Sequence, residues 1–133
     1  MTNGAPDDEA RAMIEIFKEF TFEAAHQLGA NVAPGHPYAN LHGHSFHACV
    51  LLRGTPDPET GWLHDFAEVE AALEPIRKTL DHAYLNAIEE LGLPTLENIT
   101  RYIWNRAQAD LPSLYSVTVR RGTCGEGCTY YGV

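Results

Sequence analysis

The chain has 133 residues, close to the commonest size of a single domain, and its 44% hydrophobic and 20% charged residues exclude a disordered chain. No apolar stretch approaches the about 20 residues that a membrane-spanning helix needs. Eighteen acidic against nine basic residues give a net charge of −9, which disfavours nucleic acid as a partner, and the polar start lacks the pattern of a secretory signal, so we expect a cytoplasmic protein.

The first clear pattern covers residues 14–26, where the even positions are mostly apolar from Ile14 to His26. A period of two is typical of a β-strand with one buried face, so His26 is expected at the end of a strand and on its buried side. Residues 1–12 are polar and acidic. We therefore expect a flexible tail there, followed by a single domain over residues 13–133.

A loop rich in glycine and proline follows over residues 27–40. A second strand is expected from about residue 41 to residue 53. His42 and His44 lie two positions apart in it, so both imidazoles should point to the same face of the sheet. Cys49 has the opposite parity and is expected on the other face.

Two helices are expected next. Asp65, followed by Glu68 three residues later, is the pattern of a helix start and predicts a helix over residues 66–80, which Pro75 should bend. Thr95 is the predicted cap of the second helix.

The chain closes with two β-branched and aromatic segments, residues 115–121 and 128–133, on either side of a glycine-rich turn, which predicts a hairpin. Cys124 and Cys128 in this turn could bind a metal, but two free thiols are the simpler interpretation. The element order is strand, strand, helix, helix, strand, strand, which indicates an α+β fold. Three large aromatic residues are expected in the core: Trp62, Tyr102 and Trp104.

Three histidines form the most informative set of candidate ligands. His42 and His44 lie side by side on one strand, and His26 ends a neighbouring strand. Three neutral imidazoles leave one tetrahedral position of zinc open, as in catalytic zinc sites, whereas structural sites are closed by four ligands. The sequence therefore predicts a zinc site; the alternative is an accidental His-x-His pair.

Asp81 and His82, at the end of the first helix, are the next candidates. A carboxylate beside an imidazole can hold one tautomer and supports proton transfer near neutral pH. The alternative is that these are two solvated residues after a helix.

Five successive motifs resemble those of the 6-pyruvoyl-tetrahydropterin and 6-carboxytetrahydropterin synthases over nearly the whole chain. In chain order they are Phe22-Glu23-Ala24-Ala25-His26, Leu41-His42-Gly43-His44-Ser45-Phe46, Gly61 with Asp65-Phe66, Leu80-Asp81-His82 with Tyr84-Leu85-Asn86, and Pro94-Thr95 with Glu97 and Ile103-Trp104. The closing Cys124-x-x-x-Cys128 is similar to the carboxytetrahydropterin branch, which serves queuosine biosynthesis.

This resemblance implies the tunnelling fold (T-fold), a four-stranded antiparallel sheet with two helices on one face, in which three subunits close a barrel and two trimers stack into a hexamer. It also implies a lyase that uses zinc on 7,8-dihydroneopterin triphosphate, with active sites at subunit interfaces. His26, His42 and His44 would hold the zinc, and Asp81 with His82 would relay protons.

Two positions depart from the family's pattern. Where the family has a catalytic cysteine, four residues before the His-x-His pair, this chain has Tyr38. Where the family anchors the pterin ring with a glutamate, the matching positions here are Arg121 and Gly122, and Glu126 lies nearby in the turn. Tyr38 is therefore a candidate for proton transfer, and Arg121 and Glu126 are candidates for substrate binding.

These departures leave three functions open. The first is the family's lyase reaction on dihydroneopterin triphosphate. The second is a divergent homologue that acts on a different pterin or a purine-like molecule. The third is a non-catalytic protein that binds zinc or a pterin.

Overall fold

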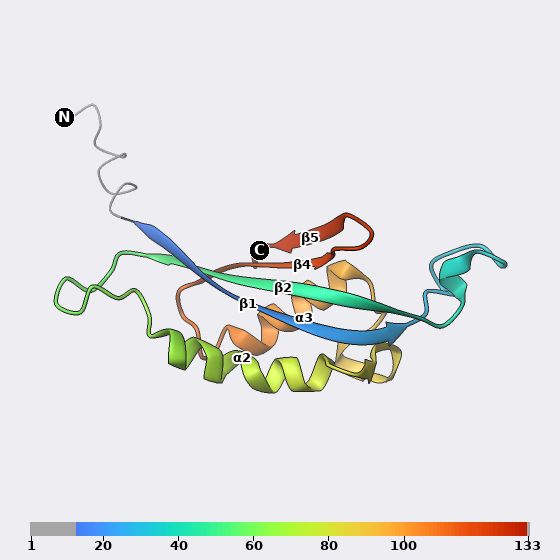
Figure 1. Ribbon diagram of the computed structural model, residues 1–133, viewed down its shortest axis with the longest axis horizontal. Helices are drawn as coiled ribbons and strands as arrows, with labels where there is room; N and C mark the ends of the chain where they lie inside the picture. Colours follow the sequence, from blue (N-terminus) through green and yellow to red (C-terminus); the bar gives the residue numbers. More distant parts are fainter. Residues whose placement is uncertain (1–12, 133) are drawn as a thin grey trace, which may run out of the picture.

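The computed structural model describes residues 13–132 and shows one curved sheet with two helices packed along one of its faces (Figure 1). The strands are β1 (Ile14–His26), β2 (His42–Gly54), β3 (Ala83–Tyr84), β4 (Leu114–Arg121) and β5 (Glu126–Tyr130), and the helices are α2 (Phe66–Leu80) and α3 (Leu96–Ala107). The single 3-10 turns η1 (Pro37–Ala39), η2 (Leu85–Ala87) and η3 (Glu89–Leu91) lie in the connections. The predicted α+β architecture is confirmed, while the predicted tail of residues 1–12 lies outside the described residues.

The long strands β1 and β2 form the centre of the sheet and pair antiparallel from Ile14 opposite Gly54 to His26 opposite His42. Their even positions face the helices, where Phe22 stacks on Phe46 with ring centroids 4.9 Å apart. Their odd positions face the other side of the sheet and are more exposed. The period of two in the sequence is therefore the alternation between the helix-covered face and the open face.

Both helices begin where capping side chains predict. Asp65 accepts a hydrogen bond from the backbone N–H of Ala67 at 2.9 Å, and Thr95 accepts one from the N–H of Asn98 at 3.2 Å. These bonds satisfy backbone donors that the first helical turn leaves without a partner. The first helix covers the predicted residues 66–80 and continues through Pro75.

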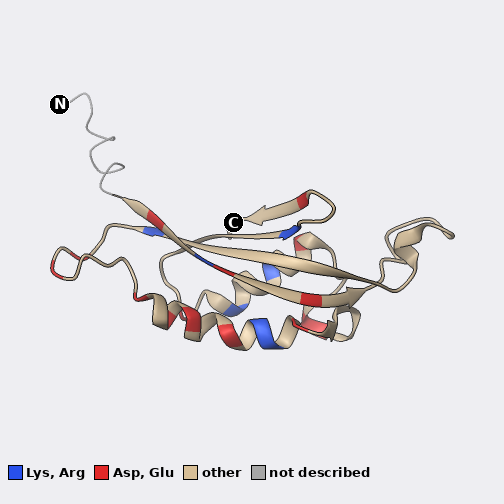
Figure 2. Cartoon of the chain, viewed as in Figure 1, with Lys and Arg blue, Asp and Glu red and all other residues tan. Residues whose placement is uncertain are grey.

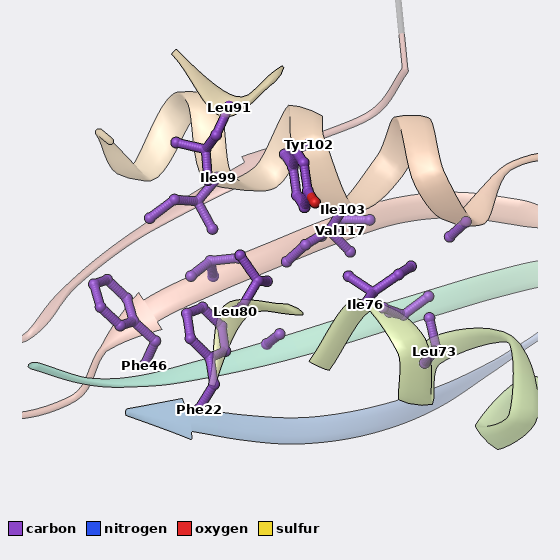
Figure 3. Close-up of a cluster of buried hydrophobic side chains, with 14 of the residues drawn as sticks. Phe22, Phe46, Leu73, Ile76, Leu80, Leu91, Ile99, Tyr102, Ile103 and Val117 are labelled. Carbon is purple, nitrogen blue, oxygen red and sulfur yellow. The ribbon is translucent and has the colours of Figure 1, made fainter. Parts of the chain in front are cut away.

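The core fills the space between the helices and the even positions of the sheet (Figure 3). Each helix contributes one apolar face at the spacing of three and four residues. The fully buried members with the largest side chains include Phe22, Phe46, Leu52, Leu80, Leu85, Ile99, Ile103 and Leu111. The histidine-bearing ends of β1 and β2 continue this buried face beyond the apolar core.

Three expectations from the sequence are corrected. The sheet has five strands in the order β3-β1-β2-β4-β5 and not the four expected. The additional strand, β3, pairs parallel to β1 and has only two residues, which is too short to leave a periodic pattern in the sequence. The last strand begins at Glu126 and not at residue 128, since the turn before it is tighter than expected. Trp62 is 60% exposed and lies outside the core, whereas Tyr102 is buried and Trp104 packs at the core's margin.

Charged residues are spread over the whole chain. Figure 2 shows Lys and Arg on α2, α3 and β4 interspersed with Asp and Glu on the helices, strands and loops. Within residues 13–132, no helix is both long enough and apolar enough to cross a membrane.

Candidate metal centre

The three predicted metal ligands converge because of the register of β1 and β2. His26 pairs directly with His42 across the two strands, and His44 follows on the same face of β2. Ala24 is the residue opposite His44, and its small side chain leaves room for the third ring. The ring centroids are 4.6 Å (His26–His42), 5.1 Å (His26–His44) and 4.8 Å (His42–His44) apart.

Backbone carbonyls orient two of these rings. Nδ1–H of His26 donates to the carbonyl of Pro94 at 2.9 Å, and Nδ1–H of His42 donates to the carbonyl of Asn40 at 2.8 Å. A carbonyl can only accept, so each proton is on Nδ1 and each Nε2 keeps its lone pair. Sequence reasoning missed Asn40 and Pro94 as orienting residues, since a backbone carbonyl leaves no signal in residue type.

The cluster fits a zinc ion. Nε2 of all three histidines is buried and has no hydrogen-bond partner within the described part of the chain. One potential ligand atom from each of the three rings lies within 4.8 Å of the other two. A carbonyl that holds the far nitrogen of a ligating histidine is the usual outer support of such sites. Three imidazoles would leave one coordination position for a ligand.

Burial favours the uncharged form of His26 and His44. The pKa of His44 is lowered to about 4, mainly by burial and in addition by the nearby His26, Arg121 and His42. Burial also lowers the pKa of His26, partly offset by its hydrogen bond to Pro94. Both rings are therefore neutral near pH 7, which is the form that binds a metal.

Tyr38 lies against the centre. Its ring stacks on His42 with centroids 5.6 Å apart and 27° between the planes. The η1 turn holds it there, because its carbonyl accepts a hydrogen bond from the N–H of Leu28 at 2.8 Å. The structure thus brings Tyr38 to the three histidines.

Arg121 also lies beside the histidines. It is opposite Phe46 in the β2–β4 pairing, on the same buried face, and its charge contributes to the lowered pKa of both His26 and His44. Its Nη2 donates to Oε1 of Glu126 at 2.8 Å. These two residues line a hollow of about 290 Å³, together with Leu28, Thr95, Leu96, Glu97, Gly127 and Cys128.

Asp81 and His82 form a second pair at the end of α2. Asp81 accepts hydrogen bonds from the backbone N–H of Glu23 at 2.9 Å and from Arg77 at 3.3 Å, and its Oδ2 lies 3.0 Å from Nδ1 of His82. The hydrogen bond from the Glu23 backbone, followed by the one from His82, lowers the pKa of Asp81. His82 has a positive φ of 58°, and its side chain is 80% exposed.

The pair does not join the metal ligands within this chain. Among the described residues, the potential metal ligands that lie close together are His26, His42 and His44, and neither Asp81 nor His82 is in this group. His82 instead lines an open hollow of about 500 Å³ whose wall also contains His44, Glu23 and Thr123. The largely exposed imidazole is therefore available to a ligand or to a second subunit.

A mostly antiparallel sheet with two helices on one face and a three-histidine cluster where β1 and β2 meet defines a candidate metalloprotein. The family model of 6-pyruvoyl tetrahydropterin synthase matches residues 15–133. The chain belongs to this family, as its motifs indicated.

Relatives within the family carry different activities in their names. The chain is 41% identical over 124 residues to a 6-carboxy-5,6,7,8-tetrahydropterin synthase from Synechocystis sp., a match that covers 87% of this chain and 92% of the relative. It is 32% identical over 112 residues to a dihydroneopterin monophosphate aldolase from Pyrococcus furiosus, covering 84% and 89% of the two chains.

Solved structures confirm the T-fold. The Caenorhabditis elegans 6-pyruvoyl tetrahydropterin synthase superposes with a TM-score of 0.81 at 25% identity, over 91% of this chain and 96% of that one. A Plasmodium vivax 6-pyruvoyltetrahydropterin synthase, at 20% identity and a TM-score of 0.68, was solved as a catalytic-residue mutant in which a glutamate is replaced by alanine.

Proposed function

We propose that this protein is a zinc-dependent lyase that acts on 7,8-dihydroneopterin triphosphate, as a 6-carboxytetrahydropterin or 6-pyruvoyl-tetrahydropterin synthase does. The observation that carries the proposal is a cluster of three histidines whose ligand atoms lie within 4.8 Å of one another and whose buried Nε2 atoms have no hydrogen-bond partner among residues 13–132. The names of the two relatives above support a pterin as the class of substrate.

His26, His42 and His44 would hold the zinc. When bound, the ion would act as a Lewis acid that makes hydroxyl groups of a substrate side chain more acidic. The hydrogen bonds to Pro94 and Asn40 keep two of the rings in the tautomer that binds.

Proton transfer is assigned to the residues around the centre. The ring of Tyr38 stacks on the imidazole of His42, which places the phenol beside the ligands. A phenol in this position can donate a proton to a bound substrate or accept one from it. Asp81 accepts a hydrogen bond from Nδ1–H of His82 and so holds the imidazole in the tautomer whose Nε2 is free to accept a proton. Because His82 is exposed, we propose that it acts on a site completed by another subunit.

Arg121 favours a second candidate function, a lyase or aldolase acting on a different pterin or a purine-like molecule. A guanidinium offers only hydrogen-bond donors, whereas a carboxylate offers only acceptors, so the two cannot bind the same edge of a heterocycle. Glu126 supplies a carboxylate next to Arg121 and is the candidate that would retain pterin binding.

Two measurements test the proposal. Metal analysis should find one zinc per chain, and His42→Ala and His44→Ala should each lose it, while His47→Ala on the open face of β2 should keep it. Unchanged zinc in both ligand variants would refute the assignment.

The second measurement is release of triphosphate from 7,8-dihydroneopterin triphosphate by the zinc-loaded protein. Release above the rate without protein supports the first function. Without release, formation of glycolaldehyde from dihydroneopterin, or of glycolaldehyde phosphate from its monophosphate, would support the second. Zinc binding without turnover of either kind would leave a non-catalytic binding protein.

A further inference from the structure

The η1 turn carries Tyr38 to the metal centre from an outlying position. It lies in the connection between β1 and β2, which extends beyond both helices at one end of the molecule (Figure 1). A single 3-10 turn has poorer hydrogen-bond geometry than an α-helix and does not propagate. The position of Tyr38 therefore depends on the bonds that other residues of the connection make to this turn.

His36 caps the turn with its side chain. Nδ1 of its ring accepts a hydrogen bond from the backbone N–H of Tyr38 at 3.1 Å, and its carbonyl accepts another from the N–H of Ala39 at 2.9 Å. The N–H of Leu28 binds the carbonyl of Tyr38, so both backbone groups of Tyr38 have a partner. Cap positions favour Ser, Thr, Asp or Asn, whose side-chain oxygen makes the same bond. A histidine supplies the acceptor and adds an aromatic ring.

This added ring contacts the side chain of Tyr38. The centroids of His36 and Tyr38 are 5.0 Å apart, with 65° between the planes, an edge-to-face arrangement in the range of attractive aromatic pairs. The ring of Tyr38 in turn stacks on His42. One exposed imidazole thus contacts both the backbone and the ring of the residue that lies against the metal centre.

We propose that His36 is a positioning residue that holds the phenol of Tyr38 beside the metal centre by capping η1. The inference rests on the proposed function for the role of Tyr38 in proton transfer, and it adds the residue that keeps Tyr38 in place for that role. His36 acts through Tyr38 and does not touch the substrate. Misplacement of a reacting group by about 1 Å can lower a rate about a hundredfold, so a cap in an exposed loop can control turnover.

NMR of the metal-free protein tests the placement without zinc or turnover. Cross-relaxation between the ring protons of Tyr38 and His42 should be present in the wild type and lost in His36→Ala. His36→Asn, whose side-chain oxygen can accept the same hydrogen bond, should restore it. His64→Ala, in the loop before α2, is the control and should leave it unchanged. Persistence of the signal in His36→Ala would overturn the proposal.

Should His36→Ala fail to fold, the ring nitrogen resonances of His36 in the wild type decide. The neutral imidazole should carry its proton on Nε2, because Nδ1 accepts the bond from the N–H of Tyr38. A proton found on Nδ1 would exclude the cap and reject the proposal.

Kinetics of triphosphate release show whether His36 acts through Tyr38. His36→Ala and Tyr38→Phe should each lower kcat by about a hundredfold, keep KM nearly unchanged and retain zinc. The double variant should lose no more than either single variant, since both changes remove the same contribution. A cap that only stabilised the chain would lower kcat again in the Tyr38→Phe background, and such multiplying losses would overturn the proposal.

The two proposals fail separately. A wild type without lyase activity refutes the proposed function, while the NMR result still decides whether His36 places Tyr38. An active wild type whose Tyr38–His42 contact is the same with and without His36 refutes only the positioning role.

Discussion

At the scale of single residues, His26 and His44 combine burial with proximity to other histidines, and both effects lower their pKa. His44 has a pKa of about 4 in the folded chain, while an exposed histidine titrates near pH 6.5. Between these values the unfolded chain binds more protons than the folded chain. The free energy of unfolding therefore falls as the pH is lowered through this window.

We predict that metal-free protein is less stable at pH 5 than at pH 7, and that His44→Gln, which removes the titrating ring, is less sensitive to this change. Urea denaturation at the two pH values measures the effect. A wild-type midpoint that rises on acidification would contradict the assigned direction. Added zinc should raise the midpoint at pH 7 and lose this effect as protons compete for the ligands.

Tyr38 occupies the position where the family has a catalytic cysteine, so its role in proton transfer does not follow from the family pattern. Its ring is placed against His42, so a thiol at this position would also lie near the centre. We predict that Tyr38→Cys raises the rate of triphosphate release by about a hundredfold, the lower end of the range typical of acid–base catalysis by one group. Tyr38→Phe, which keeps the stacking ring but lacks the hydroxyl, is the control and should retain zinc.

At the scale of elements, the pairing of β1 with β2 positions the ligands, and α2 packs against the helix-covered face of this strand pair. A slip of one residue would turn His42 and His44 to the open face, away from His26. Leu80 at the end of α2 is fully buried and precedes Asp81, whose carboxylate binds the backbone of β1. The same segment thus anchors the core and positions the Asp81–His82 pair.

Leu80→Ala should lower the free energy of unfolding by about 2–5 kcal/mol, the usual cost of removing a large buried side chain. Lys78→Ala, an exposed position on the same helix, should change it by about 0.5 kcal/mol or less. Urea denaturation of the two variants measures the difference. Equal stabilities would mean that this end of α2 is not held by the core.

At the scale of the whole molecule, the sheet has one face without helices and two edges that are largely open. Phe17 and Tyr131 are each 57% exposed on the described surface, and Tyr115 is 39% exposed. β3 pairs with only two residues of β1, and β5 forms the other edge of the sheet. Open edges and exposed apolar side chains are typical of surfaces that pair with another chain.

We propose a homo-oligomer, a trimer or a dimer of trimers. Light scattering should give a mass about three or six times the 14.7 kDa of the chain. Phe17→Glu on the open face should shift the mass toward the monomer and reduce turnover with it, while Lys78→Glu on α2 should not. A monomer with full lyase activity would contradict both the assembly and the role given to His82.

Much of the candidate site could be predicted from residue pattern. The alternation in residues 14–26 places His26 on a buried face, and the spacing of His42 and His44 places both on one face. Asp65 and Thr95 mark the helix starts correctly. These features are local, because the period of a strand and the donors of a helix's first turn act over a few residues.

Other features were decided by the tertiary structure alone. Periodicity states which face a residue occupies but not which residue lies across from it, so the pairing of His26 with His42 depends on how the chain returns through residues 27–41. The carbonyls that orient the rings, the placement of Arg121 beside them and the exposure of Trp62 have the same origin. Each depends on contacts between segments far apart in the chain, which local pattern does not encode.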